Sequence, residues 1–213
     1  MATHLYFVRH GQSNSNADGV QRGEESVLTE KGKEEALVVA ERIERIGVDA
    51  LVASSYARAI ETATPISERL GLAIETSDLL VEMRRPSSIL GKNADDPEVI
   101  AINTELFGNF GVAGYQHSDE ETFAEYKERS LEAMRFLKAH PAERICVVTH
   151  GIFLRALFCA MHIGEEYTGA DFRRMWRMRT VNTGITYAKW EEGRGDWDRG
   201  WHIVSWNDMA HLG

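Results

Sequence analysis

The feature that most constrains the fold of this chain is an alternation between short apolar runs and longer stretches with helical periodicity. The apolar runs have the length of buried strands, and in the longer stretches apolar residues recur with the spacing of one helix face. This alternation predicts an α/β fold, a three-layer sandwich whose mainly parallel sheet carries helices on both faces. The predicted strands are residues 5–8, 50–53, 73–76, 145–148, 185–190 and 201–206, and the predicted helices are residues 29–46, 56–70, 120–139 and 152–161.

Local signals refine these elements. Thr29 is a suitable N-cap for the first predicted helix, and Gly47 is suited to ending it. Pro65 lies inside the second predicted helix, where we expect a kink or a break because proline lacks a backbone N–H. The stretch from Glu82 to about residue 118 has several glycines and no long period, which favours a loop or a small helical insertion. We interpret residues 1–213 as a single domain in which the insertion, at about 83–118, covers the functional site.

The charge balance narrows the classes of ligand. The 24 basic residues against 33 acidic ones give a net charge of −9, so attraction to nucleic acid or to an anionic membrane is not expected. No apolar run approaches the roughly 20 residues of a membrane-spanning helix. A small anionic ligand held by a local cluster of arginines stays compatible with this charge.

The N-terminus and the cysteines bear on the cellular compartment. No positively charged leader or small-residue cleavage site precedes the first apolar run, so no signal peptide is predicted. Cys146 and Cys159 lie in apolar segments and match no metal-binding or redox spacing. We expect buried, reduced thiols and a cytoplasmic protein. The oligomeric state is left open.

Two predicted strands end in a histidine followed by glycine, at His10-Gly11 and His150-Gly151. Ligands bind beyond the carboxyl ends of parallel strands, so both imidazoles are expected at one edge of the sheet. Glycine at these positions lets a ligand approach the backbone closely. Arg9 and Arg58 can hold phosphate oxygens with their forked donors. A lone histidine of this kind is more often a partly buried ring bonded to a carbonyl, but the pair beside arginines indicates phosphoryl transfer to an imidazole.

These residues belong to a longer ordered set of motifs, and with that set the chain resembles the histidine phosphatase superfamily, also called the phosphoglycerate mutase-like family. The resemblance covers residues 5 to about 190. A bare Arg-His-Gly is weak evidence, whereas several ordered motifs at family-like spacing are specific. In chain order the motifs are Arg9-His10-Gly11 with Gln12, Ser13 and Asn16; Leu28, Thr29, Gly32 and Ala36; Ser54, Arg58, Ala59, Thr62 and Ala63; Glu82; Thr149, His150 and Gly151 with Arg155; and Asn182, Thr183, Gly184 and Ile185.

The resemblance implies five catalytic residues. His10, neutral at working pH, attacks phosphorus in line and becomes a phosphohistidine, which splits hydrolysis into two steps. Arg9, Arg58 and His150 stabilise the charge on the equatorial phosphoryl oxygens. Glu82 protonates the leaving alcohol and then takes a proton from the attacking water. No metal or other cofactor is expected, because the arginines supply positive charge and the other histidines are scattered along the chain.

The candidate substrate-binding residues have different expected roles. Asn16 is expected to add a neutral donor at the rim, and the hydroxyl of Ser13 either contacts phosphate or stabilises a turn. The full set of substrate-binding candidates is Ser13, Asn16, Gln21, Arg22 and Gly151. A second basic cluster is interpreted as a solvated helix face, with contact to a second acidic group of the substrate as the alternative; it consists of Arg173, Arg174, Arg177 and Arg179 beside Trp176.

The Glu82 assignment departs from the family pattern. The family commonly places a glycine a few residues after the acid, whereas this chain continues Met83-Arg84-Arg85-Pro86. The alternative interpretation of Glu82 is a surface carboxylate paired with Arg84 or Arg85.

The branch of the family follows from the residues after Asn16. Phosphoglycerate mutases usually continue with a second asparagine and Thr-Gly-Trp, whereas this chain has Ala17 followed by Asp18-Gly19-Val20. We therefore predict a phosphatase acting on small phosphomonoesters, such as sugar or carboxylic-acid phosphates. Phosphoglycerate mutase-type transfer and a non-catalytic phospholigand-binding module are the alternatives. The expected partner is a small phosphorylated metabolite, with no nucleic acid and no membrane.

Overall fold

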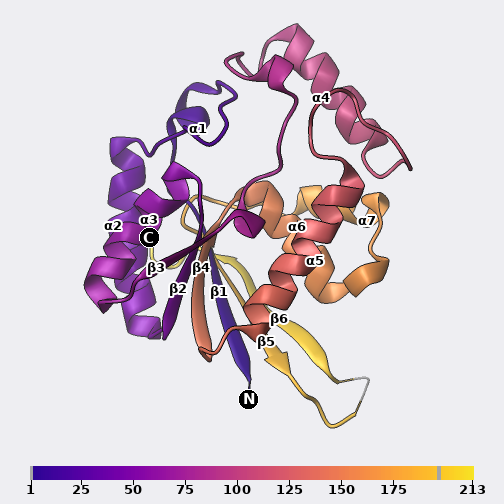
Figure 1. The fold of residues 1–213 in the computed structure, drawn as a ribbon. Helices are drawn as coiled ribbons and strands as arrows, with labels where there is room; N and C mark the ends of the chain where they lie inside the picture. The colour runs from indigo at the N-terminus through magenta and orange to yellow at the C-terminus, as the bar shows by residue number, and fades with distance from the viewer. Residues whose placement is uncertain (1, 196–197) are drawn as a thin grey trace.

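The computed structural model of the protein is built around one six-stranded mixed sheet (Figure 1). The structure describes residues 2–195 and 198–213. Strands β3, β2, β4 and β1 run parallel, and β5 and β6 add an antiparallel hairpin beside β1, giving the order β3-β2-β4-β1-β5-β6. The strands are β1 Thr3–Arg9, β2 Ala50–Ser54, β3 Ile74–Ser77, β4 Arg144–Thr149, β5 Ile185–Glu191 and β6 Gly200–Asp208. The predicted mainly parallel α/β sheet is confirmed.

Helices cover both faces of the sheet, as the sequence predicts. Helices α2 and α3 pack on one face and α5 and α6 on the other (Figure 1). Alternate residues of β1 serve the two cores: Leu5 and Phe7 pack toward α5 and α6, whereas Tyr6 and Val8 pack toward α2 and α3. The helices are α1 Asn14–Asp18, α2 Glu30–Ile46, α3 Ala57–Leu70, α4 Pro97–Asn109, α5 Phe123–Ala139, α6 Gly151–His162 and α7 Gly169–Arg174.

The predicted helix ends are confirmed for α2, but the expected break in α3 is wrong. The Thr29 hydroxyl accepts a hydrogen bond from the Gly32 amide at 3.1 Å, and Gly47 ends the helix with a φ of 72°. Helix α3 continues past Pro65. Its residues on both sides of the proline, Ala63 and Ile66, are fully buried, and this packing holds the helical conformation where the local sequence disfavours it.

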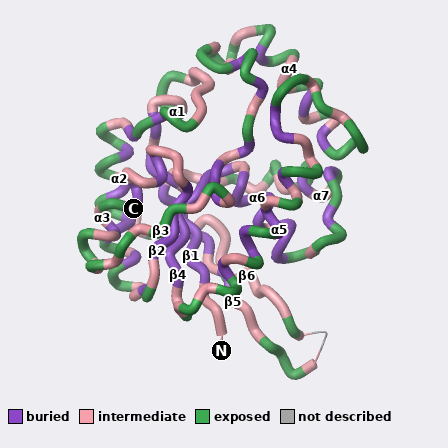
Figure 2. Tube along the Cα trace, in the orientation of Figure 1, coloured by how far each residue is buried: buried purple, intermediate pink, exposed green. Residues whose placement is uncertain are grey.

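The chain between Glu82 and α5 is partly helical, and we call residues 83–118 the cover segment. It holds a short 3-10 helix at Ser87–Ile89 and helix α4. Figure 2 shows it as a largely exposed or half-buried tube above the buried sheet, with few buried positions. Other 3-10 turns lie at Asp78–Leu80, Gly164–Glu166 and Met175–Arg177.

The two cysteines, Cys146 and Cys159, are free and buried, as predicted. Among the described residues, none of the helices combines the length and the apolar character that crossing a membrane requires.

Candidate active site

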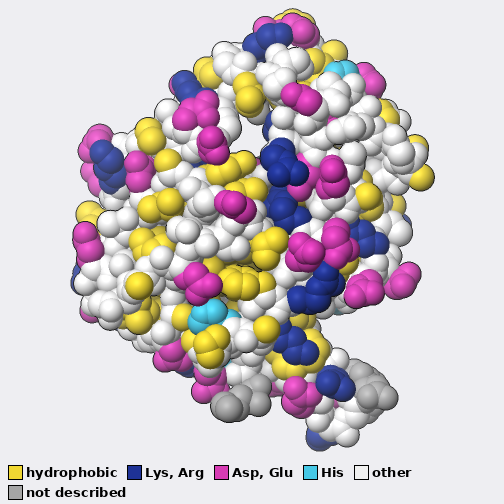
Figure 3. Space-filling model, viewed as in Figure 1, with side chains coloured by type: hydrophobic (Ala, Val, Ile, Leu, Met, Phe, Trp, Pro, Cys, Tyr) yellow, Lys and Arg dark blue, Asp and Glu magenta, His cyan; other side chains and the backbone are white. Residues whose placement is uncertain are grey.

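A cavity of about 620 Å³ opens at the carboxyl ends of the parallel strands, between the segment around α1 and the cover segment. Figure 3 shows the surface hollowed there, with basic and acidic side chains gathered beside the hollow. Nine of the ten residues predicted from the sequence line it, and His150 lies buried behind them. The nine are Arg9, His10, Ser13, Asn16, Gln21, Arg22, Arg58, Glu82 and Gly151.

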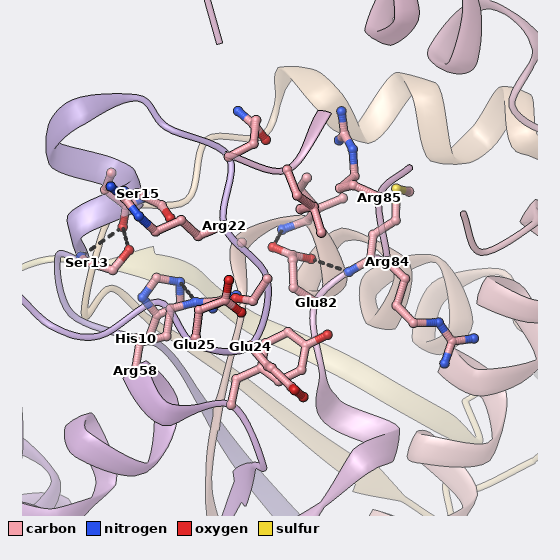
Figure 4. Close-up of a pocket in the computed structure, with 18 of the residues that line it drawn as sticks. His10, Ser13, Ser15, Arg22, Glu24, Glu25, Arg58, Glu82, Arg84 and Arg85 are labelled. Carbon is pink, nitrogen blue, oxygen red and sulfur yellow. Dashed lines mark hydrogen bonds between the residues drawn. The ribbon is translucent and has the colours of Figure 1, made fainter. Parts of the chain in front are cut away.

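The hydrogen bonds of His10 determine which ring nitrogen carries its proton. Nδ1 lies 2.7 Å from the carbonyl oxygen of Gly11, which can only accept, so Nδ1 donates. The Nε of Arg58 lies 3.3 Å from Nε2 and can only donate, so Nε2 carries the lone pair (Figure 4). Burial, together with the charges of Arg58 and Arg9, holds the pKa of His10 well below its usual value. These contacts and the lowered pKa favour a neutral imidazole whose Nε2 faces Arg58.

The two arginines beside His10 are held by backbone carbonyls. Nη1 of Arg9 donates to the carbonyl of Thr180 at 2.7 Å, and Nη1 of Arg58 donates to the carbonyl of Gly23 at 2.9 Å. Burial lowers the pKa of each guanidinium, and the Glu82 carboxylate opposes this shift. No acidic residue among those described lies within ion-pair distance of either arginine, so both charges remain available to an anion.

Gly11 and Gly151 must be glycine because other parts of the protein pack closely against them. A Cβ on Gly11 would lie 2.5 Å from the carbonyl oxygen of Gly32. A Cβ on Gly151 would lie 2.7 Å from the Thr180 hydroxyl and 3.1 Å from Nε of Arg9. Close packing thus requires glycine at both positions, and Gly151 also lines the cavity. Gly32 is constrained in the same way, since a Cβ there would overlap the Gln12 carbonyl oxygen.

His150 lies next to His10 but is completely buried. The two ring centroids are 5.1 Å apart, and Nε2 of His150 lies 2.7 Å from the Ser54 hydroxyl oxygen. Its Nδ1 has no hydrogen-bond partner among the described residues. Burial, Arg58 and His10 hold its pKa well below the usual value. This environment favours a neutral ring.

Glu82 is held by the start of helix α6 and not by an arginine. Its Oε1 accepts hydrogen bonds from the amides of Met83 at 3.0 Å and Phe153 at 2.9 Å, and its Oε2 accepts one from the amide of Ile152 at 3.0 Å. Figure 4 shows the carboxylate at the cavity wall. The alternative pairing with Arg84 or Arg85 is wrong.

The two arginines that follow Glu82 have other partners. The guanidinium of Arg84 lies 3.8 Å from the Glu121 carboxylate, and Arg85 donates to the side chain of Asn103.

The α1 side of the cavity is a tight polar network. The side-chain oxygen of Asn16 accepts hydrogen bonds from Ser13 and from the amide group of Asn182, which leaves its NH₂ group as the free donor at the rim. Both Nη atoms of Arg22 donate to the Asp18 carboxylate at 2.7 Å, and this pair lowers the pKa of Asp18 to about 2. Ser13 therefore has a structural bond in addition to its place on the cavity wall.

Several cavity residues were not expected from the sequence. Tyr56 lies under the Arg58 guanidinium, 5.0 Å from its Cζ, and packs edge-on against His150. Arg85 and Arg155 also line the cavity, and their presence near family motifs was the available signal. The cluster Arg173, Arg174, Arg177 and Arg179 does not contribute to the lining. Within the described part of the chain, no group of three or more His, Cys, Asp or Glu residues is placed to hold a metal ion.

A neutral buried histidine, flanked by two unpaired arginines at the carboxyl ends of parallel strands, defines a site suited to phosphoryl transfer. The sequence model of the histidine phosphatase superfamily (branch 1) matches residues 5–209, and the chain belongs to this superfamily.

Individual relatives agree with this assignment. The chain is 29% identical to a metal-independent phosphoserine phosphatase of Arabidopsis thaliana over 99% of this chain and 83% of the relative. It is 28% identical to a protein of Salmonella arizonae named probable phosphoglycerate mutase GpmB, over 98% and 94% of the two chains. The structure of a mycobacterial glucosyl-3-phosphoglycerate phosphatase superposes with a TM-score of 0.78 at 22% identity, covering 98% of this chain and 100% of that one. The last likeness shows the shared fold.

Proposed function

We propose that the protein is a metal-independent phosphatase that hydrolyses small phosphomonoesters through a phosphohistidine on His10, in the cytoplasm. The observation that carries the proposal is the state of the His10 ring. Its Nδ1 proton is bound to the Gly11 carbonyl, and its Nε2 lone pair points at a guanidinium that a phosphoryl oxygen can engage. The names of the relatives, which include a metal-independent phosphoserine phosphatase, support the same reaction class.

In the first step Nε2 of His10 attacks phosphorus and the bond to the ester oxygen breaks. Arg9 and Arg58 stabilise the equatorial oxygens, because both guanidinium groups are buried and free of acidic partners in the described structure. If the Ser54 hydroxyl donates to Nε2 of His150, then Nδ1 of His150 carries a hydrogen that can bond a phosphoryl oxygen.

Glu82 supplies the proton for the leaving alcohol. Its Oε1 already accepts two hydrogen bonds, whereas Oε2 accepts one, so Oε2 has a lone pair free to carry the proton. In the second step water attacks phosphorus, its proton passes to Glu82, and the N–P bond breaks to return the lone pair to His10 and release inorganic phosphate. The protein thereby returns to its starting state.

The test is hydrolysis of an aryl phosphate after exhaustive chelation, combined with rapid-quench labelling under substrate saturation. We expect turnover to survive the chelator and an acid-labile phosphate to map to His10. Activity that vanished with the chelator and returned with a divalent ion, or turnover without a labelled intermediate, would contradict the proposal.

The mutase alternative shares the phosphoenzyme and differs in the acceptor. The similarity to the protein named probable phosphoglycerate mutase GpmB is the observation that favours it. A mutase passes the phosphoryl group to a second hydroxyl, so the two are separated by measuring free phosphate against isomerised ester. Phosphate binding without either product would indicate the non-catalytic module.

A further inference from the structure

Six arginines of the described chain line this cavity, more than one phosphoryl group requires. They are Arg9, Arg22, Arg58, Arg84, Arg85 and Arg155. Arg22 pairs with Asp18, and Arg84 lies 3.8 Å from the Glu121 carboxylate, which also binds Arg129 at 2.7 Å. Within the described residues, none of the other four has a carboxylate within ion-pair distance. Arg9 and Arg58 lie beside His10, so Arg85 and Arg155 are the two unpaired cations to which the reaction assigns no role.

The guanidinium groups of Arg85 and Arg155 stack on two aromatic rings that contact each other. The Cζ of Arg85 lies 4.8 Å from the ring centroid of Phe107, and the Cζ of Arg155 lies 4.9 Å from the ring of Trp176. The two rings lie 4.6 Å apart between centroids. The stack joins α4 of the cover segment to the turn after α7, and stacking of this kind holds a guanidinium plane in place before a ligand arrives.

Both guanidinium groups retain donors for an anion. Arg85 donates from one Nη to Asn103, and its buried Nε has no hydrogen-bond partner in the described structure. Arg155 donates from Nε to the Met178 carbonyl at 3.1 Å and from Nη1 to the Gly151 carbonyl at 3.0 Å, so its second Nη is the remaining donor. Burial lowers the pKa of both arginines, which marks them as desolvated charges.

Glu82 lies between the two arginine pairs. Its carboxylate acts on the pKa of Arg9 and Arg58 on one side and of Arg85 and Arg155 on the other. Figure 4 shows His10 and Arg85 on opposite sides of Glu82. In an in-line displacement the leaving oxygen departs away from the attacking His10 nitrogen, toward the group that protonates it. The substrate beyond that oxygen therefore extends toward Arg85 and Arg155.

We propose that Arg85 and Arg155 bind a second acidic group of the substrate on its leaving-group side. This inference rests on the proposed phosphatase function and narrows its substrate class to short phosphomonoesters that carry a carboxylate or a second phosphate near the ester oxygen. The sequence leaves the role of holding a second acidic group open for the arginines at 173, 174, 177 and 179. Those arginines do not line the cavity, whereas Arg85 and Arg155 do, so we assign the role to this pair.

The test uses three esters of similar length: 3-phosphoglycerate with a carboxylate, propane-1,3-diol bisphosphate with a second phosphate, and propyl phosphate with neither. Each is measured as a substrate and as a competitive inhibitor of aryl phosphate hydrolysis, so that poor turnover does not hide binding. We expect at least one of the two doubly acidic esters to bind more tightly than propyl phosphate. The stronger of the two identifies the acidic group as carboxylate or phosphate.

The key variant is Arg85→Met, which keeps an apolar stem against Phe107 and removes the charge. A charge-assisted hydrogen bond is worth enough that we expect about a 10- to 100-fold loss in affinity and in kcat/KM for the doubly acidic ester. Arg84→Met is the matched control: Arg84 also lines the cavity, but its guanidinium lies 3.8 Å from the Glu121 carboxylate and is directed away from His10 in Figure 4. Arg85→Lys should restore part of the loss. Arg155→Met should act in the same direction, with circular dichroism to confirm that the variant folds.

The outcomes separate this inference from the proposed function. Absence of aryl phosphate hydrolysis in the native protein defeats the phosphatase proposal and this inference with it. Normal aryl phosphate hydrolysis with no preference for either doubly acidic ester, or an Arg85→Met variant that weakens propyl phosphate and the doubly acidic ester equally, defeats only this inference. A selective loss in Arg85→Met that is absent from Arg84→Met supports it.

Discussion

The floor of the cavity and the cover segment above it are held in place by different means. The floor residues are Arg9, the last residue of the central strand β1, and His10, which follows it. Main-chain hydrogen bonds fix both, from the His10 amide to the Thr149 carbonyl at 2.9 Å and from the Thr183 amide to the Arg9 carbonyl at 2.9 Å. Asn182 adds a side-chain bond to the His10 carbonyl at 2.9 Å. The floor is thus an extension of the buried sheet.

The cover segment is fastened at its edge to the loop that follows α1. The Gln21 amide donates to the Lys92 carbonyl at 2.9 Å, and the Gly91 amide donates to the Gln21 carbonyl at 2.8 Å. Asn93 donates from its side chain to the Asp18 carbonyl at 3.0 Å. Most of the segment is exposed or half-buried. The groups proposed for the chemistry thus lie on or beside the sheet and the helices packed against it. Of the two arginines proposed for substrate choice, Arg85 lies on the cover segment and Arg155 on α6.

The largest effect on activity is expected for the floor variant His10→Ala. Removing the nucleophile should lower kcat by on the order of 10⁶-fold, as for other enzymes with a covalent intermediate. The fold should survive, because the residue lies at a strand end and its ring is not part of the apolar core. A discontinuous hydrolysis assay measures kcat, and a denaturant titration measures the stability of the fold. Substantial residual phosphoenzyme in this variant would show that the nucleophile lies elsewhere.

Arg58→Ala should lower kcat somewhat less than His10→Ala does, and by a similar factor for every substrate. The guanidinium stabilises the transferred phosphoryl group, and arginines in such roles are worth about 10³- to 10⁵-fold in kcat. The matched control is Arg69→Ala on the same helix, where the side chain pairs with Glu41 outside the cavity. Single-turnover phosphorylation with alkyl and aryl phosphates measures the loss. A loss confined to one substrate would place Arg58 with the specificity residues.

Glu82→Gln probes the boundary between the floor and the cover segment. General acid catalysis is worth about 10²- to 10⁴-fold, and the loss should shrink for an aryl phosphate, whose leaving phenolate needs little protonation. The comparison requires single-turnover phosphorylation, because water activation in the second step also uses Glu82.

Equal losses for alkyl and aryl phosphates would remove Glu82 from the acid role. The nearest preceding carboxylates in sequence, Glu75 and Asp78, do not line the cavity, so the next candidates are the lining residues Glu24, Glu25 and Asp119.

The buried histidines at the floor should also lower the stability of the folded protein in acid. Burial lowers the pKa of His10 and of His150 well below 6.5, so the unfolded chain binds protons at these residues before the folded chain does. The free energy of unfolding should therefore fall as the pH drops below about 6.5, by up to about 1.4 kcal/mol per pH unit for each histidine. Denaturant titrations at pH 7.0, 6.0 and 5.5 measure the slope.

His150→Gln should reduce that slope, and the exposed His162→Gln should leave it unchanged. An unaltered slope in the His150 variant would mean that other groups set the acid sensitivity.

The smallest effect is expected for Asn93→Ala, which removes a fastening of the cover segment. The Asn93 side chain donates to the Asp18 carbonyl and accepts from the Asp95 amide at 2.9 Å, and loss of these two hydrogen bonds should lower the free energy of unfolding by about 1–3 kcal/mol. The aryl phosphate rate should be unchanged and the KM for a doubly acidic ester should rise. Asn109→Ala is the control, since its side chain donates to the Glu105 carbonyl of α4 at 2.9 Å. A fall in the aryl rate would mean that the two regions are coupled.

The sequence supported a prediction of most of the fold and of the floor. Strand and helix periodicity placed the sheet, and the two His-Gly pairs were assigned to one edge. The register that pairs Arg9 with Thr149 is what brings the two rings within 5.1 Å. The continuity of α3 through Pro65 could not be predicted, because it depends on burial of the residues around the proline.

The partners of Glu82 could not be read from the sequence either. Three donors hold its carboxylate, and two of them come from amides about 70 positions later, which no local pattern encodes. The side chain of Arg129 supports the same segment by donating to the carbonyls of Leu79 and Val81 at 3.1 and 2.8 Å. Contacts of this kind appear only when distant elements pack.

By itself, the sequence determined the α/β class, the caps of α2, and which residue types stand at the strand ends, because periodicity, caps and motifs are properties of neighbouring residues. Tertiary structure alone decided that Gly11 packs on Gly32, that His150 is buried with a lowered pKa, and that Arg85 reaches the cavity on the Phe107 ring. Each of these depends on which surfaces meet when the helices and the cover segment pack on the sheet, and the free energy of that packing is shared among residues far apart in the chain.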